Sequence, residues 1–249
     1  MSSVAVSAIV FAVVFGSALL GMFLRTVLPK DHLSDGSRAS VMIAMGLVAT
    51  MTGLVLGLLI SSAKSSFDAL SSELTGSSSE VILLDRILAS YGQDTKEVRD
   101  LLRSVVANAL NQMELKNPPV HVAVGTRGID SIFTKIQGLV PKDDRQRSIQ
   151  GEALRVLKEI RQTRWLIYEQ QSGSISMPML IILVSWLTAL FISFGLYAPT
   201  NGTVVTSLLV SALSVSAAIF LILELYSPYH GLIKISSATL RAALTQLGN

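Results

Sequence analysis

The sequence predicts an all-α integral membrane protein with four transmembrane helices and a helical region between the second and third spans. Hydrophobic residues make up 50% of the 249 residues and charged residues 15%, a balance that ordinary soluble domains do not have. Four apolar stretches are each long enough, at about 1.5 Å per residue, to cross a hydrocarbon core of about 30 Å as a helix. Between the second and third stretches the chain is rich in charge and its hydrophobic periodicity is helical.

The first two spans lie near the N-terminus. Residues 4–24 contain no charge and end at Arg25. The basic start and the small-residue cleavage site of a signal peptide are not evident, so we expect this span to be retained. Residues 40–63 form the second span, 24 residues without a charge.

One face of the second span consists of small and polar residues, which recur at steps of three and four and therefore share one side of a helix. This small-residue face comprises Gly46, Thr50, Gly53, Gly57 and Ser61. The same step reaches Lys64 and Asp68, the first charges after the span, which would form its mouth. Two interpretations stay open: close packing of helices in lipid, or the lining of a water-filled path formed by several copies.

The middle region, residues 64–176, is expected to continue the second span as a helix. A heptad seam of apolar residues runs along it. Its members are Phe67, Leu70, Leu74, Val81, Leu84, Leu88 and Tyr91, with Ser77 out of pattern. The seam predicts either a coiled coil with a partner or a helix packed on its own chain. The Gly-Ser-Ser-Ser run at residues 76–79 predicts a break or a kink.

Further helices are predicted at residues 95–115, 128–139 and 144–171, each with apolar residues at helical spacing. The third and fourth spans follow at residues 177–197 and 203–226, joined by a tight turn. In the fourth span we expect a second row of small residues to pack closely. This row comprises Ser207, Ser211, Ser214 and Ala217.

The chain ends in a short amphipathic helix from Ser237, expected to rest on the membrane surface or on the soluble helices. The predicted organisation is residues 1–63 with two spans, 64–176 soluble, 177–226 with two spans, and 227–249 amphipathic. Four spans place both termini and residues 64–176 on one side. We expect that side to be the cytoplasm.

Several function classes are not expected. The chain has no cysteine, which excludes disulfides and thiolate metal sites. It shows no phosphate-binding glycine loop, zinc-protease helix or nucleophile elbow, so we expect no enzyme, no cofactor and no metal site. With a formal net charge of +3 it also lacks the basic surface that nucleic acid binding needs. The lipid bilayer is the expected environment.

Two segments carry a resemblance to a known family: GLVATMTGLVLGLLISSAKSSFD at residues 46–68 and LELYSPYHGLIKISSATLRAALTQLG at residues 223–248. With the two-plus-two arrangement of spans, the chain resembles the bacterial family of unknown function described as bestrophin-like. Bestrophins are homo-oligomeric channels, typically pentamers that pass anions, in which the second span lines the pore. The resemblance implies that this chain, too, forms a homo-oligomeric channel for inorganic ions, in particular anions, with the second span lining the pore, in a bacterial inner membrane. The alternative is a non-conducting membrane scaffold or signalling protein whose cytoplasmic helices bind a partner.

Overall fold

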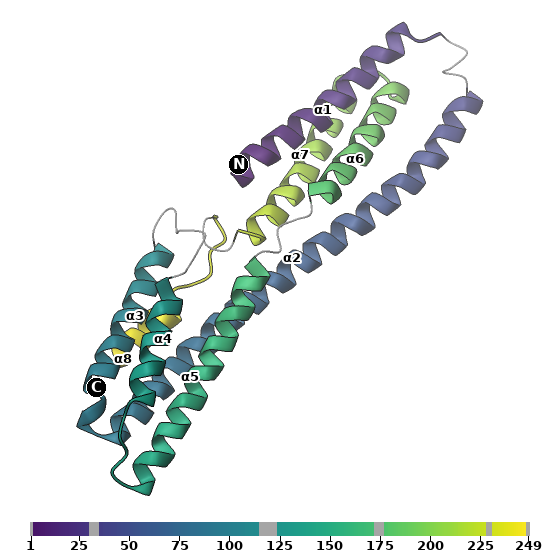
Figure 1. Ribbon diagram of the computed structural model, residues 1–249. Helices are drawn as coiled ribbons and strands as arrows, with labels where there is room; N and C mark the ends of the chain where they lie inside the picture. The colour runs from purple at the N-terminus through teal and green to yellow at the C-terminus, as the bar shows by residue number, and fades with distance from the viewer. Residues whose placement is uncertain (1, 30–34, 115–123, 172–176, 228–230, 248–249) are drawn as a thin grey trace. The chain divides into compact units, whose positions relative to one another are not determined.

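The computed structural model describes residues 2–29, 35–114, 124–171, 177–227 and 231–247. Within these residues every regular element is a helix (Figure 1). Four of them are long and apolar enough to cross a membrane, so the predicted fold class is confirmed. The chain divides into two compact units, residues 1–66 with 174–227 and residues 67–173 with 228–249. The domain boundaries at residues 64 and 227 stay predictions, and the boundary at 176 lies outside the described residues.

The first unit holds the membrane spans. These are α1 (Ser3–Val27), the first part of α2 (Asp35–Tyr91), α6 (Met177–Tyr197) and α7 (Gly202–Leu225). Helix α1 packs against both α6 and α7, as Figure 1 shows. Helices α1 and α7 begin with side-chain caps: the Ser2 hydroxyl accepts from the amide of Ala5, and the Asn201 side chain accepts from the amide of Val204 at 2.9 Å. The Asn201 side chain thus fixes where the fourth span begins.

Helices α1 and α6 cross in backbone contact at two glycines. A Cβ added to Gly21 would overlap the carbonyl oxygen of Ile192, and one added to Gly195 would overlap the carbonyl oxygen of Ala18. Small residues permit such an approach in lipid, where helices associate through packing rather than through a hydrophobic drive. Gly21 and Gly195 therefore hold the first and third spans together.

We expect Gly21→Ala to destabilise the membrane unit by about 2 kcal/mol, since overpacked sites cost about 1 to 3 kcal/mol and the obstacle here is backbone. Gly16→Ala on the same helix is the matched control, because a Cβ there meets no atom within 4 Å. The control should be neutral or slightly stabilising. Thermal unfolding in detergent measures both, and equal midpoints would contradict the crossing.

Helix α7 turns a different row of small residues inward from the one predicted. The predicted row is exposed; it comprises Ser207, Ser211, Ser214 and Ala217. Its expected close packing therefore does not occur within one copy. Ala212 and Ser216 are buried instead. The Ser216 hydroxyl donates to the carbonyl oxygen of Ser7 on α1 at 2.6 Å, and this bond between helices favours the Ser216 side of α7 at the contact.

The second unit is a bundle of helices with an apolar core. It holds the rest of α2, the short 3-10 helix η2 (Gln93–Thr95), α3 (Lys96–Glu114), α4 (Val124–Gln137), α5 (Asp144–Gln171) and α8 (Ala238–Gln246). Each α-helix contributes to one core cluster, for example through Leu84, Leu102, Ile132, Leu157 and Leu240. Helix α8 therefore packs on the soluble helices, the second of its two predicted positions.

Helix α2 is continuous through residues 76–79, so the predicted break is wrong. Three of the seam residues, Val81, Leu84 and Leu88, are buried in the core of their own unit. The chain itself thus covers this part of the seam, and no coiled-coil partner is needed for it. Burial stabilises the fold by about 1.5 to 3 kcal/mol for each of these three side chains. The one glycine and three serines lose about 2 to 3 kcal/mol of helix propensity in total. Burial is the larger effect, so the helix continues.

Candidate functional site: the outer face of α2

The apolar part of α2 is the least covered of the four spans. In its most apolar window 11% of residues are buried, against 33% in α1, α6 and α7. Leu59 and Ala63 lie on its buried side, whereas Ile43, Leu47 and Leu54 are more than 60% exposed. Most of this helix is therefore available to lipid or to another copy of the chain.

The five residues of the small-residue face are all exposed. A Cβ added to Gly46, Gly53 or Gly57 would meet no atom within 4 Å. This is the reverse of Gly21, whose Cβ would collide with a neighbouring helix. Packing within one copy therefore does not explain the small-residue face, while both predicted interpretations, packing between copies and a water-filled path, remain available to it.

Thr50 has its hydroxyl satisfied within the helix, because it donates to the carbonyl oxygen of Gly46 at 2.9 Å. Such bonding to a carbonyl one turn back lets a hydroxyl lie in lipid at little cost. The oxygen still has lone pairs that can accept a further hydrogen bond. The Thr50 hydroxyl is thus compatible with either interpretation.

The exposed face does not end at Asp68. Every residue reached by continuing the same steps of three and four along α2 is also exposed. These further residues are Ser72, Thr75, Ser79, Leu83, Arg86 and Ser90. We call the whole set, from Gly46 to Ser90 with Lys64 and Asp68 included, the outer face of α2. Its soluble part was not predicted, because the apolar heptad seam on the opposite side of the helix is the stronger pattern.

The outer face repeats every eleven residues. Positions 46, 57, 68, 79 and 90 recur at that spacing, with the steps four, three and four between them. Eleven residues in three turns give about 3.67 residues per turn, close to the 3.6 of a straight helix and on the side that favours a slight right-handed supercoil. One side of α2 is therefore exposed at every position of this repeat, from Gly46 to Ser90.

Three ionisable residues lie on the outer face: Lys64, Asp68 and Arg86. Arg86 makes no ion pair with any described residue. Glu80 lies off this face and has one carboxylate oxygen buried. Burial, and then the nearby charge of Glu159, raise the pKa of Glu80. With two basic residues and one acidic residue, the outer face itself has a net charge of plus one per copy.

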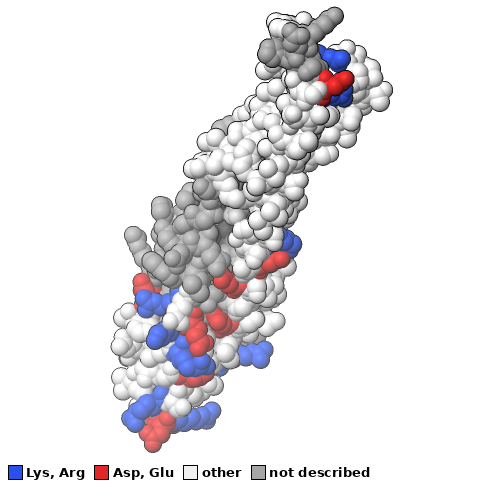
Figure 2. Space-filling view, turned by 90° about the vertical axis from the view of Figure 1, so that its right-hand side faces the viewer, with Lys and Arg blue, Asp and Glu red and all other residues white. Residues whose placement is uncertain are grey.

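Figure 2 shows where charged residues lie on one side of the surface. The surface of the span-bearing unit is white apart from its ends, while blue and red atoms gather on the soluble unit. Most described ion pairs there link exposed side chains, such as Arg155 with Glu152 and Glu159. Mixed, paired charge of this kind keeps a surface soluble and does not mark a binding site.

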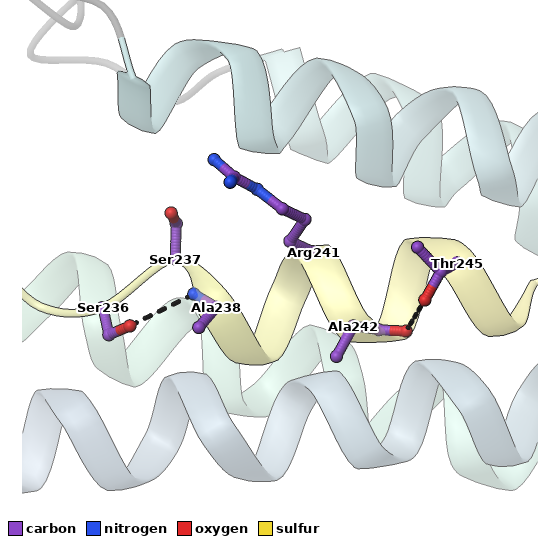
Figure 3. Close-up of a pocket in the computed structure, with 6 residues that line it drawn as sticks. All are labelled: Ser236, Ser237, Ala238, Arg241, Ala242 and Thr245. Atoms are coloured by element: carbon purple, nitrogen blue, oxygen red, sulfur yellow. Dashed lines mark hydrogen bonds between the residues drawn. The ribbon is translucent and has the colours of Figure 1, made fainter.

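A shallow depression on α8 offers no comparable chemistry. It is lined by Ser236, Ser237, Ala238, Arg241, Ala242 and Thr245 (Figure 3). The Ser236 hydroxyl accepts from the amide of Ala238 and the Thr245 hydroxyl donates to the carbonyl oxygen of Ala242, so both are engaged with their own segment. Among the described residues no three His, Cys, Asp or Glu side chains group as metal ligands. The outer face of α2 is therefore the candidate site.

A protein-family model described as a bestrophin-like domain matches residues 7–240. No curated protein and no solved structure matches the chain.

Proposed function

Because the chain belongs to the bestrophin-like family, we propose that it assembles into a homo-oligomeric ion channel. Copies of α2 gather about a common axis and turn their small-residue face toward it. Five copies is the number that the resemblance to bestrophins implies. The single observation that supports this arrangement is that the small-residue face is uncovered in one copy.

The three glycines of this face explain why covering or wetting it matters. Each glycine inside a helix costs about 1 kcal/mol relative to alanine, so Gly46, Gly53 and Gly57 together cost about 3 kcal/mol. Within one copy no neighbouring group approaches them to compensate. In a ring of copies they leave room at the axis, and the hydroxyls of Thr50 and Ser61 supply polar contacts for water and ions.

The mouth of the proposed conduit holds Lys64, which follows the last residue of the small-residue face by one helical step. With residues 64–176 in the cytoplasm, Lys64 stands at the cytoplasmic mouth. A positive charge there raises the local anion concentration. We therefore propose anions as the conducted ions.

The test is to measure currents from the purified protein in planar bilayers under a salt gradient. We expect the wild type to conduct with a preference for anions, and Lys64→Glu to lower the anion-to-cation permeability ratio by about threefold or more, since charge at a pore mouth acts on ion entry. Lys96→Glu is the matched control, because Lys96 is exposed at the start of α3 and is not part of the outer face.

Silence in repeated reconstitutions of the wild-type oligomer would contradict the channel and favour the scaffold alternative. An equal change in permeability from Lys64→Glu and Lys96→Glu would contradict the role given to the mouth.

A further inference from the structure

The soluble half of α2 has two sides with opposite surroundings. Its heptad side enters the core through Val81, Leu84 and Leu88. Its outer side, which includes Ser79, Arg86 and Ser90, is exposed and is not covered by any described part of the same unit. The role inferred below for this outer side rests on the proposed function.

A dry seam between copies is not compatible with this side. In a ring of parallel copies each residue meets its own equivalents at the same level, so Arg86 would face Arg86. A dry helix seam takes apolar residues at successive steps, whereas Leu83 is the one apolar member of the face beyond Asp68. Equal charges and hydroxyls at a common axis require water between the copies.

The three charges of the outer face do not act equally. Lys64 and Asp68 are four residues apart, about 6 Å along a helix, which is less than the screening length of about 8 Å at physiological salt. Asp68 therefore offsets part of the charge that Lys64 brings to the mouth. Arg86 lies 18 residues beyond Asp68, about 27 Å, so neither of them offsets it.

Arg86 is also a charge that the rest of the fold leaves available. It is exposed and has no ion pair among the described residues. By contrast, Arg99 on the neighbouring helix is held by both carboxylate oxygens of Asp85 at 2.8 Å. An exposed guanidinium is a donor well suited to small anions.

We infer that Arg86 is a specificity-determining residue of the conduit, and that a ring of Arg86 side chains, rather than Lys64 alone, selects small inorganic anions in the soluble part. Lys64 contributes less to selectivity than Arg86, because Asp68 offsets part of its charge. Selection thus takes place in the soluble part of α2 and not within the span.

The absence of cysteine from the sequence permits a direct test on the full-length oligomer. Arg86→Gln should lower the anion-to-cation permeability ratio about threefold to tenfold, and Arg86→Lys should keep it. Arg86→Cys should lose selectivity and regain it after modification with a positively charged methanethiosulfonate reagent. Arg103→Gln is the matched control, since Arg103 is exposed on α3 and has no ion pair among the described residues.

The outcomes separate this inference from the proposed function. A wild type that passes no ion overturns both. A conducting wild type in which Gly57→Cys is blocked by the reagent, while Arg86→Gln and modified Arg86→Cys change selectivity no more than the Arg103 variant, overturns the inference alone. A loss at Arg86 that the positive reagent reverses supports it. Unfolding midpoints equal to the wild type show that the fold is intact.

Discussion

Gly57→Leu closes the conduit: we expect ion flux into liposomes to fall at least about tenfold while the protein still folds. In one copy a Cβ at Gly57 meets no atom within 4 Å, and replacing a helical glycine removes a cost of about 1 kcal/mol. In a ring, however, every copy brings a leucine to the same level of the axis. The side chains then fill the space that ions need and form an apolar constriction.

Gly16→Leu is the control for this variant. Gly16 lies on α1, is exposed, and has no atom within 4 Å of an added Cβ, so it matches Gly57 in its surroundings within one copy. We expect Gly16→Leu to leave the flux unchanged. Unchanged flux in Gly57→Leu would instead contradict the proposal that α2 lines the conduit.

The same pair of variants separates the two interpretations of the small-residue face. If the face lines a water-filled path, Gly57→Leu loses flux but keeps the size of the oligomer in detergent. If the face is a dry contact between copies, the leucine cannot enter it, and the oligomer dissociates or changes size. Size-exclusion chromatography with light scattering distinguishes these results.

The four spans could be predicted because length and apolar composition determine which segments enter lipid. Which side of each span packs inside the chain was harder to predict. Helix α7 has small residues on more than one side, and burial of Ser216 depends on the carbonyl of Ser7, more than two hundred residues away. Periodicity within one helix does not contain that information.

The soluble unit shows a similar limit. Local propensity indicated a break at residues 76–79, yet the helix continues because Val81 and Leu84 bury themselves against other helices of the unit. The position of α8 also depends on that core, which Leu240 and Leu247 help to form. The soluble part of the outer face was predictable in principle, since the eleven-residue step is present in the sequence, but it becomes evident once the opposite side is seen to be buried.

The second large effect is expected at the link between α2 and α3. Arg99 donates two hydrogen bonds to the carboxylate of Asp85, each at 2.8 Å. The side chain of Asp85 is 4% exposed and that of Arg99 22%, and the bond to Asp85 raises the pKa of Arg99. Asp85→Ala leaves the guanidinium partly buried without its partner, which we expect to destabilise the soluble unit by about 3 kcal/mol.

The comparison pair for this prediction is Asp144 with Arg147, whose side chains are 97% and 72% exposed. An exposed pair contributes at most about 1 kcal/mol, so Asp144→Ala should change the unfolding midpoint little. Similar losses in Asp85→Ala and Asp144→Ala would contradict the role given to burial.

The double variant Asp85→Ala with Arg99→Ala separates a lost attraction from a stranded charge. Removing both partners leaves no buried guanidinium, so the double variant should be more stable than Asp85→Ala alone, and the coupling between the two sites should be about 1 to 3 kcal/mol. Chemical unfolding monitored by circular dichroism measures all three variants. Because Asp85 directly precedes Arg86 on α2, the same link holds in place the helix turn that carries Arg86.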